Sequence, residues 1–409
     1  MNYLQHTLAN GIRLIHKPLS NGVAHCGLLI NAGTRDEREG ENGIAHFIEH
    51  VIFKGTKKRK AFHILSRMEN VGGDLNAYTS KEETTVYCSF LPKYYERSLE
   101  LISDIVFHSV FPDREIRKEK DVVMDEINHY KDTPSEEIYD EFEKMIYSGH
   151  PLGTDILGTP EDVRRIDREK IRQFIANHYH TDQMVISSAG NIDFEKLKNL
   201  AEKYFGGIPA NYRRNGRMPY KGYIARQGEE KRNANLSHAC IGNTAYSMKD
   251  DRRLSLVLLN NILGGPGMNS RLNLSIREKY GFTYNIDSMY LPYSDTGVFS
   301  IYLGTDKGYM DKSIRLVHKE LKRLRENKLG TLQLQRAKQQ ITGQIAIALE
   351  SNVNEMLSNG KTFLHMDRVD SFAEISRKIN DIKETQLLEV ANEIFDPGQL
   401  TSLIYRSND

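Results

Sequence analysis

Three residues in one short segment have the types and spacing to bind a metal ion and use it. His46 and His50 stand four residues apart in a run with helical spacing, and Glu49 lies between them. On a helix, residues i, i+3 and i+4 share a face, so the three side chains project together. Two imidazoles spaced in this way can hold one Zn²⁺, and a carboxylate that is not a ligand can act as general base toward a metal-bound water. The segment therefore indicates a metal-dependent hydrolase, and the alternative is a chance string whose histidines are ordinary core or surface residues.

A catalytic zinc ion needs a third protein ligand, and the helix expected over residues 113–130 offers two candidates. It carries Glu119 and Glu126, seven residues apart and so on one face. Glu126 follows the apolar run 122–124, which places a carboxylate at the edge of a buried surface, where it needs a partner. A metal held by two histidines and a glutamate would be that partner. A surface salt bridge is the alternative, above all for Glu119.

The composition indicates a soluble globular chain without a strongly charged partner. Its 409 residues are 39% hydrophobic and 27% charged, with a formal net charge of +1. This balance provides no large positive field for nucleic acid, and no apolar stretch approaches the roughly 18 residues of a membrane span. The three cysteines lie far apart, so we expect no disulfide framework. The N-terminus lacks signal or transit character, and we therefore expect a cytoplasmic protein.

Hydrophobic periodicity predicts an α+β fold of two duplicated domains. In the first half, short strands alternate with amphipathic helices, and the second half repeats this order from about residue 236. A stretch rich in Pro, Gly and basic residues separates the halves, as a linker would. We expect domains at 1–215 and 233–409 joined by a linker at 216–232. Each domain should be a largely antiparallel sheet packed with helices.

Several motifs together resemble those of a known family. The run 43–50, followed by Phe53-Lys54-Gly55-Thr56, Asn76-Ala77-Tyr78-Thr79 and the run 122–126, is similar to the pitrilysin or insulinase family of inverted-motif zinc peptidases. The short bacterial members that are similar to mitochondrial processing peptidase resemble it most, over nearly the whole chain. The resemblance implies a zinc-dependent endopeptidase that attacks a peptide carbonyl with metal-bound water. It implies one Zn²⁺ per chain, with ligands His46, His50 and Glu126, base Glu49 and supporting acid Glu119.

The resemblance also implies residues that bind an extended peptide substrate. Asn76, Ala77 and Tyr78 would belong to an edge strand that pairs with the peptide. Arg277 and Tyr284 would hold the substrate and stabilise the oxyanion, near a glycine-rich loop at 263–268. An ordinary edge strand, a helix stop, a structural arginine and a core tyrosine are the alternative interpretations.

Alignment of the two halves indicates that only the first binds metal. Placing Gly55 on Gly264 puts Ser255, Leu258 and Leu259 at the positions of the metal-binding segment, and Gln344 near that of Glu126. We therefore expect one metal per chain, with a second domain that binds substrate or closes a chamber.

Two domains are half of the four-domain enclosure that the family uses. We therefore predict a homodimer in which the zinc of one chain works with Arg277 and Tyr284 of the other. Two alternatives remain. The chain could be a non-catalytic partner or scaffold subunit of the same fold. It could also be a hydrolase that acts on something other than peptides, which a buried Tyr78 and edge strand would favour.

Overall fold

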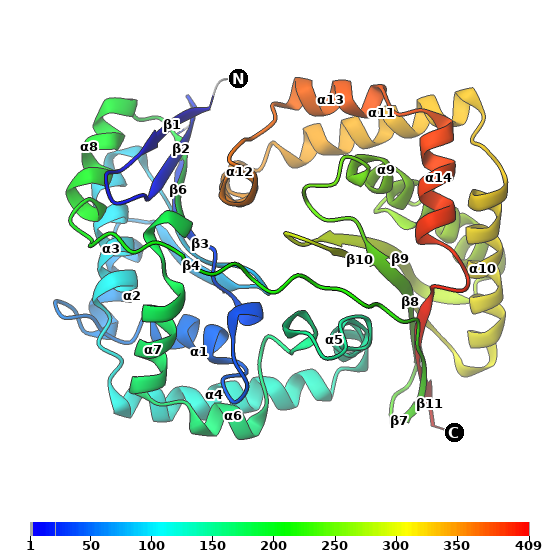
Figure 1. Cartoon of the computed structure of the whole chain (residues 1–409), viewed down its shortest axis with the longest axis horizontal. Coiled ribbons are helices and arrows are strands. Elements are labelled where there is room, and N and C mark those ends of the chain that lie inside the picture. The colour runs from blue at the N-terminus through cyan, green and yellow to red at the C-terminus, as the bar shows by residue number, and fades with distance from the viewer. Residues whose placement is uncertain (1–2, 21, 409) are drawn as a thin grey trace. The chain divides into compact units, whose positions relative to one another are not determined.

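The chain folds into two compact units, each built around its own sheet (Figure 1). The computed structural model describes residues 3–20 and 22–408. Unit 1 consists of Met1–Asn128, Thr154–Arg217 and Ile347–Ser371, and unit 2 of His129–Gly153, Met218–Ala346 and Phe372–Asp409. The contiguous domains expected from the sequence thus differ from these units, because each unit contains a segment from the opposite half of the chain.

The sheet of unit 1 has six strands in the order β1-β2-β6-β3-β5-β4. Neighbouring strands are antiparallel except for β2 and β6, which run parallel. The strands are β1 (Leu4–Thr7), β2 (Arg13–Pro18), β3 (Ala24–Ile30), β4 (Asp74–Thr79), β5 (Thr84–Phe90) and β6 (Met184–Gly190). The helices are α1 (Ile44–Val51), α2 (Ala61–Glu69), α3 (Tyr95–His108), α4 (Asp113–Lys131), α6 (Pro160–Arg165), α7 (Arg168–His178), α8 (Phe194–Phe205) and α12 (Asn352–Met366).

Unit 2 repeats this topology with five strands in the order β7-β11-β8-β10-β9. Here β7 and β11 are parallel and the other neighbouring pairs are antiparallel. The parallel pair β7–β11 thus corresponds to the parallel pair β2–β6 of unit 1. The predicted α+β duplication is therefore confirmed. The strands are β7 (Gln227–Arg232), β8 (Ser237–Ala245), β9 (Thr283–Pro292), β10 (Gly297–Thr305) and β11 (Thr401–Ser407). The helices are α5 (Pro134–Ile146), α9 (Arg253–Gly264), α10 (Met310–Glu326), α11 (Thr331–Ala348), α13 (Phe372–Asn380) and α14 (Glu384–Ile394).

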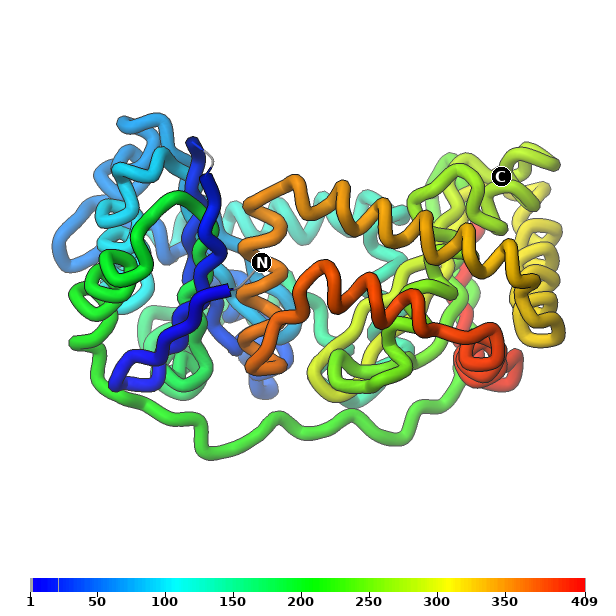
Figure 2. Tube along the Cα trace, turned by 90° about the horizontal axis from the view of Figure 1, so that it is seen from above, coloured from blue at the N-terminus to red at the C-terminus, as the bar shows by residue number. Residues whose placement is uncertain are grey.

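The irregular stretch between the two halves begins and ends earlier than the linker expected at 216–232. Residues 209–226 contain no helix or strand, and Figure 2 shows them as one extended segment. Residues 227–232, which were included in the linker, instead form β7 beside β11. The Pro- and Gly-rich composition explains the irregular part, whereas β7 has the sequence Gln-Gly-Glu-Glu-Lys-Arg and lacks the apolar alternation by which strands are predicted.

The exchanged segments supply a helix to each sheet. Helix α12 packs on β6, β3 and β2 of unit 1, with Phe363 and Leu364 against Leu29 and Val185. Helix α5 packs on β8 and β11 of unit 2, in a cluster that includes Phe142. Each central strand is thereby covered on both faces, which explains why β6 is buried along its whole length.

Helix α1 is fixed at its N-terminus by two local features. It begins after Gly43, whose φ of 86° is left-handed and whose Cβ, if present, would lie 2.5 Å from the carbonyl oxygen of Leu157. Only glycine fits such a position. The buried Glu37 carboxylate accepts hydrogen bonds from the backbone N–H groups of Gly43 (3.0 Å) and Ala45 (2.9 Å). Glu37 thus satisfies N–H groups that a helix start leaves without partners.

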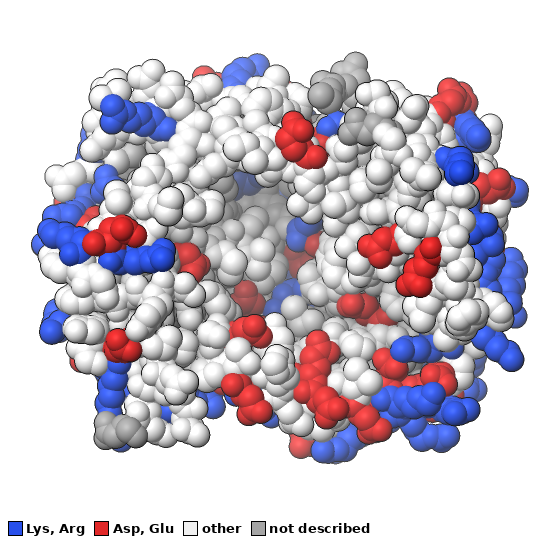
Figure 3. Space-filling model, turned by 180° about the vertical axis from the view of Figure 1, so that it is seen from behind, with Lys and Arg blue, Asp and Glu red and all other residues white. Residues whose placement is uncertain are grey.

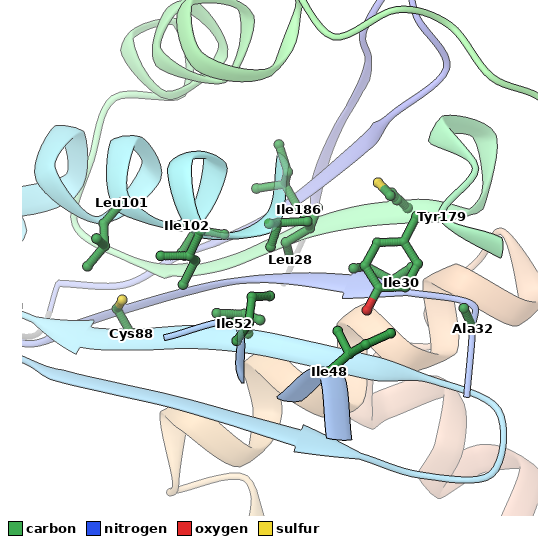
Figure 4. Close-up of a cluster of buried hydrophobic side chains, with 14 of the residues drawn as sticks. Leu28, Ile30, Ala32, Ile48, Ile52, Cys88, Leu101, Ile102, Tyr179 and Ile186 are labelled. Carbon is green, nitrogen blue, oxygen red and sulfur yellow. The ribbon is translucent and has the colours of Figure 1, made fainter. Parts of the chain in front are cut away.

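The apolar face of α1 anchors it in the core of unit 1. Figure 4 shows Ile48 and Ile52 in the same cluster as Leu28 of β3, Ile102 of α3 and Ile186 of β6. The opposite face carries the predicted metal-binding side chains. Because one face is locked into the core, the other has a defined orientation.

Charged side chains of both signs share the molecular surface. On the face shown in Figure 3, Lys and Arg are interspersed with Asp and Glu. Among the helices that the structure describes, none has the length and apolar character needed to cross a membrane.

Gly360 should be required for the close approach of α12 to the sheet. A Cβ there would lie 2.6 Å from Cδ1 of Leu29 and 2.8 Å from Cβ of Ser187. Overpacking costs about 1–3 kcal/mol, and the better helix propensity of alanine offsets about 1 kcal/mol. Gly360→Ala should therefore lower the free energy of unfolding in urea by about 1 kcal/mol. Gly343 of α11 has open space around it, so Gly343→Ala should raise that free energy by about 0.5–1 kcal/mol. Equal effects at the two sites would contradict this packing.

Glu37→Ala should destabilise unit 1 from the start of α1. Two buried N–H groups lose their acceptor, at about 1–3 kcal/mol each, so the free energy of unfolding should fall by about 2–4 kcal/mol. Hydrogen exchange at the Gly43 and Ala45 amides should become faster. The exposed Glu39 provides the control, since Glu39→Ala should change stability by less than about 0.5 kcal/mol. Unchanged exchange at both amides in the Glu37 variant would rule out this anchoring role.

Candidate metal centre

Three side chains of unit 1 converge as a metal site requires. His46 and His50 of α1 and Glu126 of α4 each offer one donor atom, and these atoms lie within 4.8 Å of one another. Glu126 Oε2 is 3.8 Å from Nε2 of His46 and 3.5 Å from Nε2 of His50. Ligands at about 2.0–2.2 Å from one zinc ion are about 3–4 Å apart, so the spacing and the N₂O donor set both fit Zn²⁺.

Burial prepares His46 to bind a cation. Desolvation, with His50 beside it, lowers the pKa of His46 to about 4. The imidazole is therefore neutral near pH 7, which is the form that binds a metal. The two rings are packed edge to face with centroids 4.7 Å apart. Glu126 is more exposed than either ring, so the third donor lies on the accessible side of the group.

Glu119 supports the group from the other side of His50. Its Oε2 lies 3.4 Å from Nδ1 of His50, whereas Glu126 faces Nε2 of the same ring. The second oxygen of Glu119 forms an ion pair of 2.7 Å with Lys54. A carboxylate at the far nitrogen holds a ligating imidazole in orientation and raises its basicity. Glu119 does form a salt bridge, but it is buried rather than on the surface.

Glu49 lies on the same helix but outside the three-residue donor group. Burial raises its pKa above the ordinary value, and the nearby His50 partly opposes this shift. A carboxyl group with a raised pKa is suited to accepting a proton near neutral pH. Thr79, the last residue of β4, lies close to Glu49, and α1 packs beside this edge strand.

The strand that carries Asn76, Ala77 and Tyr78 is at an edge. Among the described strands, β4 pairs only with β5. Its outer backbone groups can therefore accept a further strand. Asn76 is exposed, and Ala77 and Tyr78 are half-buried. Burial raises the pKa of Tyr78 to about 12, so its phenol stays protonated at neutral pH.

Arg277 and Tyr284 belong to unit 2 and are not among the residues of the metal group. Arg277 is exposed at the end of the π-helical turn Asn273–Glu278 (η5). Tyr284 lies on β9, which is the edge strand of unit 2 as β4 is in unit 1, and is 59% exposed. The exposure of both residues disfavours the structural-arginine and core-tyrosine interpretations.

The second half has no counterpart of the metal group where the duplication would place one. Helix α9 is followed by the glycine-rich loop and packs on β9, as α1 packs on β4. Its residues Ser255, Leu258 and Leu259 are buried and offer no pair of imidazoles.

Three contributors to the site were missed by the sequence analysis. Lys54 stands four residues after His50, and this helical spacing could have indicated it. Thr79 lies in a predicted strand, but its contact with Glu49 depends on how helix and sheet pack. Glu37 precedes the helix in a segment without periodicity, so no local signal marked it.

The chain matches family models along most of its length. Residues 14–160 match the model described as insulinase (peptidase family M16), and residues 165–341 match the M16 inactive domain. The second match is consistent with the absence of ligand residues from α9. The residues of the converging group all lie in the first match.

Proteins and structures similar to this chain carry related names. The Bacillus subtilis protein named "Uncharacterized zinc protease YmxG" is 32% identical over 99% of this chain and 98% of that protein. The beta subunit of bovine mitochondrial-processing peptidase is 29% identical over 97% of this chain and 83% of its own length. The same fold occurs in the crystal structure of a protease from Helicobacter pylori, with a TM-score of 0.90, 23% identity and 99% of both chains covered. It also occurs in a structure titled as a peptidase M16 inactive domain from Pseudomonas fluorescens, with a TM-score of 0.93, 19% identity, and 100% of this chain and 98% of that chain covered. Both halves of this chain match M16 family models, and a relative is more than 30% identical to it over almost the whole length of both proteins. This chain therefore belongs to the M16 (insulinase) family of peptidases.

Proposed function

We propose that this chain is a zinc-dependent endopeptidase that hydrolyses peptides or unstructured polypeptides bound as an extended strand. The observation that carries the proposal is the convergence of His46, His50 and Glu126, with Glu49 on the same helix but outside the donor group. This separates three ligands from one base, as metal-assisted hydrolysis requires. Family membership and the names of the relatives support the same reaction class.

Each residue near the metal group then has a chemical role. When bound, one Zn²⁺ per chain would lower the pKa of a coordinated water and polarise the substrate carbonyl. Glu49 accepts the proton of the attacking water and delivers it to the leaving amine. Glu119 keeps the His50 ring in the orientation in which Nε2 faces the metal.

The edge strand β4 would present the substrate to Glu49. A peptide that pairs with the outer edge of β4 beside Asn76, Ala77 and Tyr78 continues the antiparallel ladder and is held by its main chain. The exposed position of Asn76 favours this interpretation over a hydrolase for non-peptide substrates. Main-chain recognition also favours unstructured peptides, because a folded segment has no free backbone groups to offer.

Arg277 and Tyr284 would complete the site from a second copy of the chain. An arginine and a phenol can bind a peptide carbonyl and stabilise the developing oxyanion. The proposed arrangement is a homodimer in which these two residues serve the metal group of the partner subunit. The exposure of both side chains leaves them available for such a role.

A non-catalytic partner or scaffold is the second candidate function, since one of the matched structures carries the name of an inactive domain. The intact donor group and the base argue against it. A scaffold has no need to keep three donor atoms within 4.8 Å of one another. A cytoplasmic location belongs to the same proposal as the peptidase, supported by three buried, free cysteines.

Glu49→Gln should separate metal binding from catalysis. The variant keeps the size of the side chain and all three ligands, so zinc content should stay near one per chain, while the loss of the base should lower kcat by about 10²–10⁴-fold. Metal analysis and cleavage of an unstructured peptide library provide the measurement.

Substitutions of neighbouring residues on α4 supply the controls for this experiment. Glu126→Gln should lose both zinc and turnover. The adjacent, exposed Asp125 lies outside the donor group, so Asp125→Asn should keep both. Undiminished cleavage by the Glu49 variant would refute the mechanism, and absence of zinc from the unaltered chain would favour the scaffold.

Co-expression of two inactive variants should restore activity if the site is shared. In a mixed dimer of Glu49→Gln and Arg277→Ala chains, the second chain provides an intact base and the first an intact arginine. Random pairing makes half of the dimers mixed, with one of two sites complete, so about one quarter of the wild-type activity should return. Each variant alone should stay inactive. A fully active monomer on a sizing column, or no recovery in a proven mixed dimer, would exclude sharing.

A further inference from the structure

Unit 2 contains a cavity of about 410 Å³ beside the glycine-rich loop. Its walls come from that loop, from the exchanged helix α5, and from β9 and β10, so all of it lies within one compact unit. The volume is in the range of cavities that hold small ligands or single side chains. The chemistry of three of its walls points to one kind of occupant.

The first wall is a carboxylate that lacks a partner. Asp287 of β9 is half-buried, and among the described residues none pairs with it or donates a hydrogen bond to its side chain. Burial raises its pKa, with no neighbouring cation to oppose the shift. Arg277 lines the same cavity but forms no ion pair with Asp287 within the described contacts. A partly buried carboxylate without a counter-charge is unfavourable, and a cationic ligand would relieve that cost.

The second wall is a pair of aromatic rings. Tyr302 of β10 stands directly across from Asp287 in the strand register. Tyr139 of α5 stacks on Tyr302, with ring centroids 5.2 Å apart and planes 29° from parallel. The Tyr302 hydroxyl is 2.9 Å from Nδ1 of His238, which holds the ring in place. Aromatic faces attract ammonium and guanidinium groups.

The third wall is the glycine-rich loop that follows α9. A Cβ at Gly264 would lie 2.6 Å from the backbone nitrogen of Ser288 and 3.0 Å from the carbonyl carbon of Asp287, so the helix end reaches the strand that carries the carboxylate. The next residues, Gly265 and Gly267, line the cavity itself. The loop residues that line the cavity, Gly265, Pro266, Gly267 and Met268, carry no charge, so this wall places no competing cation near Asp287.

We infer that this cavity is a subsite for a cationic side chain of the peptide substrate, with Asp287 as the partner of its ammonium or guanidinium group. The inference rests on the proposed function only in taking the ligand to be the substrate. The cation pairs with the carboxylate, and its alkyl stem lies against the two tyrosine rings. Asp287 is thus a specificity-determining residue.

The test compares peptides that differ in charge but not in shape. The Glu49→Gln chain, which should not cleave, is titrated with a fluorescent unstructured peptide that carries one arginine at successive positions. In a matched series, citrulline replaces the arginine. At one position or more, the arginine peptide should bind at least about tenfold more tightly, as expected for a charge-assisted hydrogen bond. A lysine and acetyl-lysine pair should show the same sign.

Variants assign the preference to this cavity. Asp287→Asn should abolish the arginine preference, while Asp287→Glu, which restores the charge, should recover part of it. Asp381 is exposed and does not line the cavity, so Asp381→Asn should leave the preference unchanged. Arginine and citrulline peptides that bind equally at every position would overturn the inference, and so would a preference that survives in Asp287→Asn.

The outcome does not depend on whether the chain is a peptidase. If the unaltered chain holds no zinc and cleaves nothing, the proposed function fails, but a preference for arginine that depends on Asp287 would still establish the cation site. If cleavage proceeds and the citrulline peptides are bound and cut equally well, the function stands and the subsite falls. The comparison of arginine and citrulline peptides uses a chain in which Asp287 is intact. It therefore remains decisive even if the Asp287 variants fail to fold.

Discussion

The site depends above all on how one eight-residue helix is held. Helix α1 is too short to be stable by itself, so its position must come from tertiary contacts. Its apolar face is locked into the core of unit 1, and its first turn is held by Glu37 and by the glycine at which it starts. With both restraints in place, His46 and His50 keep a common direction toward α4. A looser helix would leave the imidazoles ordered only by the metal.

A second constraint arises from the two sheets. Central strands such as β6 are buried on both faces, and therefore each sheet needs helices on both sides. The chain meets this need by exchange, with α12 covering the sheet of unit 1 and α5 that of unit 2. Residues Lys17 and Glu355, both buried, form an ion pair between β2 and α12. The exchange ties the folding of each unit to both halves of the sequence.

The two units use the same topology for different chemistry. In unit 1, the helix beside the edge strand carries two histidines and a glutamate, and the strand offers its free edge. In unit 2, the corresponding helix α9 buries Ser255, Leu258 and Leu259. Its C-terminal end instead borders a cavity with an unpaired carboxylate on β9. The second unit thus has a helix and an edge strand in the same places as the first, without its donor residues.

Features that depend on local geometry could be predicted from the sequence. The spacing of His46, Glu49 and His50 places them on one face of any helix, and Glu119 and Glu126 share a face for the same reason. The alternation of strands and helices, and their repetition, were enough to predict two α+β halves. The candidate donor residues of the first half, and the apolar residues at the corresponding positions of the second, can be read from these local patterns.

Contacts between distant segments could not be predicted from the sequence, because they depend on tertiary packing. The register of α4 against α1 places Glu126 beside both Nε2 atoms and Glu119 at Nδ1 of His50, and no local pattern distinguishes the two glutamates in this way. The same holds for Glu37 under the first turn of α1, for the exchanged helices, and for Asp287 opposite the stacked tyrosines. Each of these contacts joins elements whose approach is set by the packing of complete side-chain surfaces, which periodicity does not encode.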